Sequence, residues 1–148
     1  MKISTKGRYG LRAMVDIALN SAGDYIPLKV IAERQGISEN YLEQVFSTLR
    51  KSDLVKSIRG SQGGYSLSKP ASKTTVGEVL RALEGELTIT SDDSAAPGFN
   101  KSVEDCIKLK VWQQVNKSIN DVVDSITLED IVDQYKKLND DYVLDFTI

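Results

Sequence analysis

The side chains best suited to a chemical task lie between Ile37 and Leu67, and the task they suit is contact with a nucleic acid. Apolar residues recur there at helical spacing, so a helix beginning after Ser38 would bury one face made of Leu42, Val45, Phe46 and Leu49. The opposite face carries side chains that can hydrogen-bond to base edges and phosphates: Ser38, Asn40, Tyr41, Gln44, Ser47 and Arg50. This pattern is typical of a recognition helix.

A basic, glycine-rich hairpin follows this helix directly. Residues 55–58 and 65–67 have the composition of two short strands, and the loop between them contains glycines that can adopt positive φ. We expect this hairpin to act as a wing beside the recognition helix. Arg59, Gly60 and Ser61 would reach a minor groove, where the negative potential of a narrow groove attracts arginine. The alternative is a surface helix and hairpin that bind no ligand.

Two further helices are expected upstream, over residues 3–21 and 28–35. Gly36 suits the left-handed position after the second of them, so residues 32–42 have the helix-turn-helix pattern. Basic and hydroxyl side chains crowd the beginning of the first helix: Lys2, Thr5, Lys6 and Arg8. Because a helix N-terminus attracts anions, we expect a phosphate contact there, and the alternative is a solvated helix end.

Composition and charge narrow the class of protein. The 148 residues are 41% hydrophobic and 27% charged, and they include one cysteine and no histidine. Residues 1–74 hold 12 Lys/Arg and 6 Asp/Glu, whereas residues 75–148 hold 7 and 15, so the first half suits a polyanion and the second does not. No apolar run approaches the roughly 20 residues of a membrane span, and the first residues lack the apolar core of a signal peptide, so we expect a cytoplasmic protein. The composition offers no catalytic histidine and no metal constellation, which argues against an enzyme.

Three motifs carry a family resemblance: K-I-S-T-K-G-R-Y-G-L at residues 2–11, S-E-N-Y-L-E-Q at 38–44 and L-V-K-S-I-R-G-S-Q-G-G-Y at 54–65. They resemble the Rrf2 family of bacterial winged-helix transcription regulators. The resemblance implies a homodimeric repressor on a palindromic operator in double-stranded DNA. It also implies base contacts by Ser38, Tyr41 and Gln44, a wing contact by Arg59 with Gly60, and base discrimination by Glu43, whose carboxylate can accept from cytosine N4.

The expected fold class is mainly α with a small β-hairpin: a winged helix-turn-helix domain over residues 1–74, followed by a dimerisation region over 75–148. The latter comprises a helix from Thr75 to Gly85, a mobile loop over 86–101, one long helix over 102–125, and a C-terminal helix and tail. The long helix carries an apolar stripe that the family uses for dimerisation: Val103, Ile107, Val111, Val115, Ile119 and Val122. The alternative is a helix that packs within its own chain.

The loop before this helix is where cluster-binding members of the family place three cysteines and a fourth ligand. Here only Cys106 matches that set, and Leu109 stands where some members have histidine. One thiolate per chain does not hold a [2Fe–2S] cluster in the usual way, so we expect no cofactor and no metal. Cys106 is expected to be a small buried hydrophobe, with a redox sensor as the alternative.

The last ten residues are acidic and aromatic and follow a helix expected over residues 127–138. They resemble the tail of the cluster-free CymR branch of cysteine-metabolism repressors, which binds cysteine synthase (O-acetylserine sulfhydrylase). The resemblance implies that Asp145, Phe146, Thr147 and Ile148 could bind this enzyme as a C-terminal carboxylate motif. The alternative for the tail is that it packs on its own dimer or frays. For the whole protein, the alternatives are an interaction module that does not read DNA sequence and a redox or iron–sulfur-sensing regulator.

Overall fold

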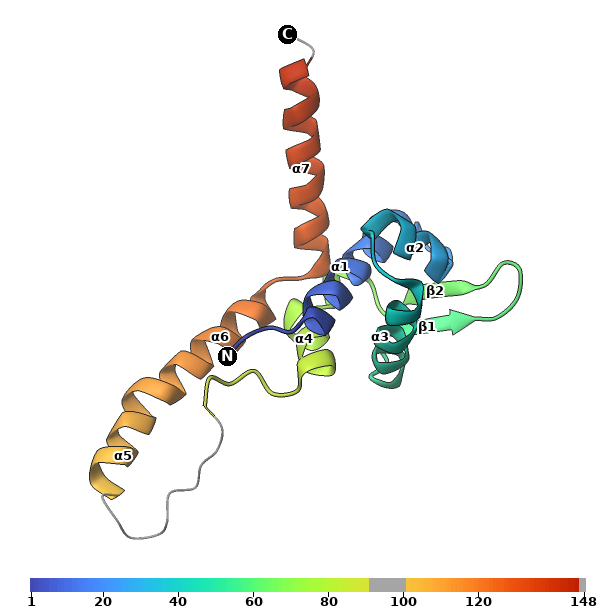
Figure 1. Ribbon diagram of the computed structural model, residues 1–148. Coiled ribbons are helices and arrows are strands. Elements are labelled where there is room, and N and C mark those ends of the chain that lie inside the picture. The colour runs from blue at the N-terminus through green and yellow to red at the C-terminus, as the bar shows by residue number, and fades with distance from the viewer. Residues whose placement is uncertain (91–100, 147–148) are drawn as a thin grey trace.

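The computed structural model describes residues 1–90 and 101–146, and for residues 101, 102 and 141–146 it describes the backbone only. The chain folds as α1 (Thr5–Asn20), α2 (Leu28–Gln35), α3 (Glu39–Lys51), β1 (Val55–Ile58), β2 (Gly64–Leu67), η1 (Ala71–Lys73), α4 (Val76–Glu84), α5 (Lys101–Ile107), η2 (Lys108–Trp112), α6 (Gln113–Ser125) and α7 (Leu128–Phe146). The predicted fold class, mainly α with one antiparallel hairpin, is confirmed (Figure 1).

The helix-turn-helix forms where the sequence predicts it. The Ser38 hydroxyl caps α3 by accepting from the backbone N–H of Tyr41 at 3.3 Å. Gly36 ends α2 with φ of 64°, a left-handed conformation that favours glycine. The turn between α2 and α3 is therefore fixed by local residue chemistry at both of its ends.

The wing is a two-stranded antiparallel hairpin whose register runs from Val55 opposite Leu67 to Ile58 opposite Gly64. The return strand begins at Gly64, one residue earlier than predicted, because that residue still pairs with Ile58. Its φ is 154°, and a Cβ there would overlap the carbonyl of Ile26, which lies on the far edge of β2. Backbone bonds between Ile26 and Tyr65, 2.8 and 2.9 Å long, fasten the hairpin to the segment before α2.

The hydrophobic core joins the winged helix to the helices that follow it. Its fully buried side chains from the first half include Met14, Ile17 and Phe46, and Phe46 packs against the ring of Tyr65 with centroids 4.7 Å apart. The same core includes Val79, Leu83 and Leu128 from α4 and α7. It therefore crosses the domain boundary predicted between residues 74 and 75, and α4 and the beginning of α7 are held rigidly to the winged helix.

The long helix predicted over residues 102–125 is continuous in direction but not uniform in geometry. It begins at Lys101, and residues 108–112 form a π-helical segment between α5 and α6. A π turn inserts extra residues and rotates the following side chains around the helix axis, so an apolar stripe read at regular spacing does not stay on one face. The predicted loop over 86–101 lies, for residues 91–100, outside the described residues.

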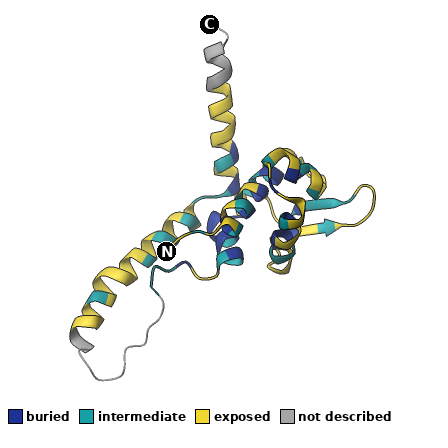
Figure 2. Ribbon diagram, viewed as in Figure 1, coloured by how far each residue is buried: buried dark blue, intermediate teal, exposed yellow. Residues whose placement is uncertain are grey.

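Helix α7 is longer than predicted, because it continues to Phe146 instead of ending near residue 138. No glycine or proline interrupts residues 128–146, so nothing in the sequence stops the helix. At its beginning Thr127 and Asp130 cap each other, with the Asp130 carboxylate accepting from the Thr127 N–H at 2.9 Å and the Thr127 hydroxyl accepting from the Asp130 N–H at 3.1 Å. The helix leads away from the rest of the fold, and residues 129–140 are mostly exposed (Figures 1 and 2).

Candidate nucleic-acid interface

Helix α3 has the two faces that the sequence predicts. Its inner side chains are buried in the core: Leu42, Val45, Phe46 and Leu49. The predicted contact residues Ser38, Asn40, Glu43, Gln44 and Arg50 are exposed, and Tyr41 is half-buried. A helix anchored along one side and polar along the other can be laid in a major groove without exposing its apolar residues.

The Tyr41 side chain is partly exposed and also packs against α1. Its ring meets the ring of Tyr9 on α1 edge to face, with centroids 6.1 Å apart and planes at 83°. The Arg12 guanidinium lies 5.3 Å from the centroid of Tyr9 and donates to the carbonyl of Gln35 at the end of α2. Sequence reasoning missed Arg12, although its position one helical turn after Arg8 could have indicated a second cation on the same face.

The wing carries its predicted residues at an exposed tip. Arg59, Gly60 and Ser61 are all exposed, and Gly60 has φ of 112°. Its carbonyl accepts from Gly63 N–H at 2.9 Å, which closes the loop. Arg50 on α3 donates to the hydroxyl of Ser57 on β1 at 3.5 Å, a weak contact between the recognition helix and the base of the wing. The tip projects away from the helices, as a wing that reaches an adjacent groove requires (Figure 1).

The beginning of α1 differs from the prediction in one respect. Ser4 caps the helix, but the carboxylate of Glu84 from α4 lies on the same helix end, where one oxygen accepts from the N–H groups of Ser4 and Gly7, each at 3.0 Å, and from the Ser4 hydroxyl. The prediction that this helix end would itself receive a phosphate is therefore wrong, because a carboxylate already satisfies those donors. Lys2, Thr5 and Arg8 are exposed beside it and Lys6 is half-buried, so the three cationic side chains and the Thr5 hydroxyl remain able to contact phosphates.

A buried ion pair fixes α2 against α1. Asp16 is 2% exposed, and its carboxylate accepts two bonds from Arg34, at 2.7 and 3.0 Å, and one from the side chain of Gln35 at 2.9 Å. The hydrogen bond from Arg34 to Asp16 raises the pKa of that guanidinium. The pair sets the angle of the first helix of the helix-turn-helix motif, and thereby the direction in which α3 is presented.

The winged helix and the helices that follow it have counterparts among known proteins. A family model described as "Iron-dependent Transcriptional regulator", Rrf2, matches residues 3–134. The chain belongs to the Rrf2 family. It is similar to the HTH-type transcriptional regulator IscR of Escherichia coli, with 40% identity over 139 residues that cover 94% of this chain and 85% of IscR.

Solved structures of the Rrf2 family share the fold. CymR, the global cysteine regulator of B. subtilis, aligns with a TM-score of 0.76 and 38% identity over 90% of this chain and 98% of CymR. T. potens IscR aligns with a TM-score of 0.73 and 43% identity over 93% of this chain and 90% of that protein. The chain is accordingly a winged-helix transcriptional regulator of this family, whose relatives are described as transcriptional regulators.

The family's iron-dependent members raise the question of a cluster, and the donor set of this chain does not fit one. The sequence contains one cysteine and no histidine, and within residues 1–90 and 101–140 no three His, Cys, Asp or Glu side chains gather as a metal site would require. Cys106 itself is exposed, so the expectation that it is buried is wrong for the single chain, because it lies on an outer face of α5.

Among the described helices, none is both long and apolar enough to cross a membrane.

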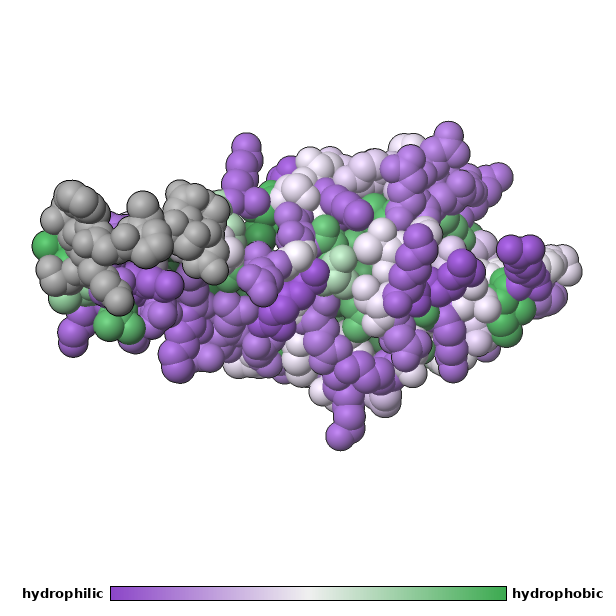
Figure 3. Space-filling model, turned by 90° about the horizontal axis from the view of Figure 1, so that it is seen from below, coloured by the Kyte–Doolittle hydropathy of each residue, from purple (hydrophilic) through white to green (hydrophobic). Residues whose placement is uncertain are grey.

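The predicted dimerisation residues divide into two sets. Val103, Val111, Val115 and Val122 are exposed, at 62%, 41%, 38% and 57%, together with Leu109 and Trp112. Ile119 instead packs with Val123 and Ile126 against Val76, Leu80 and Leu87 of its own chain, and Ile107 is half-buried. The alternative of packing within the chain is thus correct for Ile119. Hydrophobic residues appear between hydrophilic ones at the α5 end of the molecule (Figure 3).

Proposed function

We propose that this chain is a homodimeric, sequence-specific repressor that binds a palindromic operator. The observation that carries the proposal is the joint geometry of α3 and the wing: exposed polar side chains on the helix, an exposed Arg59 at the wing tip, and one core that holds both elements. The helix would read base edges in a major groove through Ser38, Gln44 and Glu43, and the wing would enter the minor groove.

The exposed apolar side chains of α5, η2 and α6 support the homodimer. Exposed apolar side chains in this number along consecutive helical segments are uncommon on a monomer and are ordinarily covered by a partner. Two copies related by a twofold axis would present two α3 helices to successive major grooves, which matches a palindrome with half-sites about one helical turn apart.

The second part of the proposal concerns the signal to which the repressor responds. We propose a cluster-free, cytoplasmic repressor of the CymR kind, because the chain lacks the cluster ligands and is similar to a regulator of cysteine metabolism. Its C-terminus would bind cysteine synthase through the motif predicted at residues 145–148. Asp145 and Phe146 lie at the end of α7, and Thr147 and Ile148 lie outside the described residues. Deleting Ile148 should weaken binding to that enzyme, and equal affinity of the shortened protein would refute this partner.

Fluorescence anisotropy with an operator duplex and a random duplex of equal length tests the proposal. Arg59→Ala should weaken operator binding by about 1–3 kcal/mol, and mainly for operators with a narrow, A·T-rich minor groove under the wing. Gln62→Ala at the same tip is the matched control, since Gln62 is exposed, carries no charge and is not among the predicted DNA contacts. Operator affinity that is unchanged in Arg59→Ala would refute the assigned role of the wing.

A second candidate function is an interaction module whose C-terminal half binds another protein. The exposed Tyr135 and Leu138 on α7, 50% and 60% accessible, and the excess of acidic residues after residue 74 favour it. Equal affinity for operator and random duplex would support this candidate over the repressor.

A further inference from the structure

Helix α4 lies between α1 and α6, and glycines allow all three helices to approach closely. A Cβ on Gly7 would overlap the carboxylate of Glu84, and a Cβ on Gly10 would overlap the Leu83 side chain. On the other side of α4, a Cβ on Gly77 would overlap the carboxylate of Asp124 from α6. The three helices are therefore packed so tightly that a displacement of α4 must be shared by its neighbours.

At its C-terminal end, α4 holds the start of the chain. One oxygen of Glu84 accepts from the Ser4 N–H, the Ser4 hydroxyl and the Gly7 N–H. Ser4 is the last residue before α1, so these bonds fix the path of the segment that carries Lys2. Lys6 and Arg8 follow in the first turn of α1, which the Tyr9–Tyr41 contact joins to the recognition helix.

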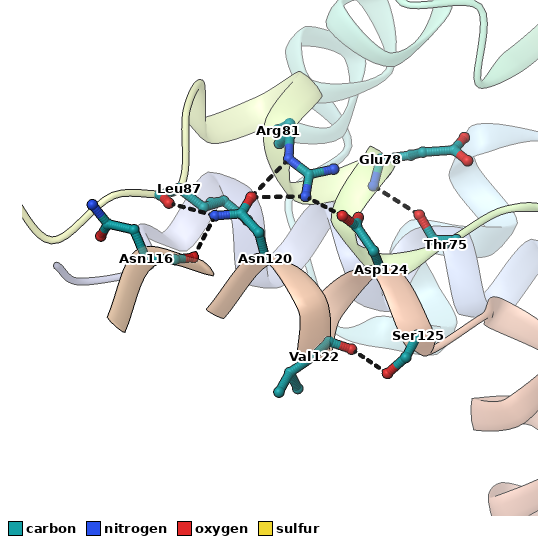
Figure 4. Close-up of polar contacts among 9 residues, drawn as sticks. All are labelled: Thr75, Glu78, Arg81, Leu87, Asn116, Asn120, Val122, Asp124 and Ser125. Carbon is teal, nitrogen blue, oxygen red and sulfur yellow. Dashed lines mark hydrogen bonds and ion pairs between the residues drawn. The ribbon is translucent and has the colours of Figure 1, made fainter. Parts of the chain in front are cut away.

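On its opposite side, α4 is hydrogen-bonded to α6, and α6 is hydrogen-bonded in turn to the segment that follows α4. Arg81 donates to the side chain of Asn120 at 2.8 and 3.2 Å and to Asp124 at 2.7 Å (Figure 4). Asn120 in turn donates to the carbonyl of Leu87 at 3.0 Å. The same short helix thus contacts the basic start of the chain through Glu84 and the proposed dimerisation helix through Arg81.

We infer that Glu84 is a positioning residue for DNA binding. Its carboxylate holds the N-terminal arm, defined as residues 1–8, so that Lys2, Lys6 and Arg8 lie in line with α3 for contact with one stretch of phosphates. This inference rests on the proposed DNA-binding function. If Glu84 positions the arm, its removal should weaken DNA binding. Charge alone predicts the opposite, because a carboxylate beside a phosphate-binding arm repels DNA and its removal should strengthen binding.

The experiment measures operator affinity of the full-length protein at several salt concentrations. Each phosphate contact contributes about 0.9 to the slope of log affinity against log salt. Glu84→Ala should lower the slope by about one to two and weaken operator binding on the order of tenfold, as cationic contacts of the arm are lost. Glu84→Gln retains an acceptor oxygen for the same three donors and should restore most of the slope.

Two controls separate positioning from charge and from misfolding. Glu86→Ala removes an exposed carboxylate two residues away and should leave the affinity unchanged or raise it. Gly7→Ala keeps every charge but displaces the Glu84 carboxylate, so it should reproduce the loss of slope. In the Glu84→Ala background the same Gly7→Ala change should have little further effect, because the side chain it would overlap has been removed.

A Glu84→Ala protein with the slope and affinity of the unmodified protein, or with tighter binding like Glu86→Ala, would overturn the inference. So would a Glu84→Gln protein that loses as much slope as Glu84→Ala, since an acceptor oxygen at this position would then not be what holds the arm. Failure of the proposed function itself is distinguishable, because the unmodified protein would then not prefer the operator over random duplex.

Discussion

The ion pair of Asp16 and Arg34 permits a prediction in which the loss of stability depends on which partner is removed. The Asp16 side chain is 1% exposed, whereas that of Arg34 is 38% exposed. Arg34→Ala would leave the buried carboxylate with the Gln35 amide, at 2.9 Å, as its remaining side-chain partner among the described residues. Asp16→Asn would leave a guanidinium that already reaches water, so its cost should be smaller.

The magnitudes follow from this asymmetry. Removing one partner of a buried ion pair costs about 3–5 kcal/mol, which we assign to Arg34→Ala. Asp16→Asn keeps the shape and loses charge-assisted hydrogen bonds, for which we expect about 1–2 kcal/mol. The double variant removes the buried charge altogether and should be more stable than Arg34→Ala alone. For a chain of this length each kcal/mol lowers the melting temperature by about 2–4 °C.

Thermal unfolding followed by circular dichroism at one fixed protein concentration measures these differences, since association would make stability depend on concentration. Lys29→Ala is the matched control, because it removes an exposed cation from the same helix and should change stability by less than about 0.5 kcal/mol. The reasoning is refuted if Arg34→Ala is no less stable than Asp16→Asn, or if the double variant is the least stable of the three.

Three further predictions concern the packing around α4 and the proposed dimer. The hydrogen bond from Arg81 lowers the pKa of Asp124 from the ordinary 3.8, so its contribution to stability is complete above that value and is lost as the pH falls through the lowered value. Asp124→Asn should therefore flatten the acid side of the stability profile, and an acid limb of the same steepness would contradict this. Val122→Asp, at a side chain 57% exposed, should convert a dimer into monomers in sedimentation equilibrium without lowering the content of helix. Gly10→Ala should destabilise the protein by about 1–3 kcal/mol in urea unfolding despite the better helix propensity of alanine, because its Cβ would overlap Leu83; a stabilised variant would show that α1 and α4 can separate at little cost.

Local residue chemistry was sufficient to predict the DNA-binding half from the sequence. The Ser38 cap, the left-handed Gly36 and the apolar spacing of α3 each depend on residues within a turn or two of one another, so their pattern is visible along the chain. The same holds for the capping of α7 by Thr127 and Asp130 and for the glycines of the wing. The predicted exposure of Arg59, Gly60 and Ser61 is confirmed for the same reason.

Partners far apart in the sequence decided the rest. Glu84 reaches the beginning of α1 from 77 residues beyond Gly7, so no local pattern could predict that a carboxylate would occupy that helix end. The π-helical segment over 108–112 changed which apolar side chains of the long helix face outward. Ile119 packs against α4 within its own chain. The sequence alone determined the elements and the recognition face, because their causes are short-range; the tertiary structure decided how α4 joins the arm to α6, because that arrangement depends on three helices approaching at glycines.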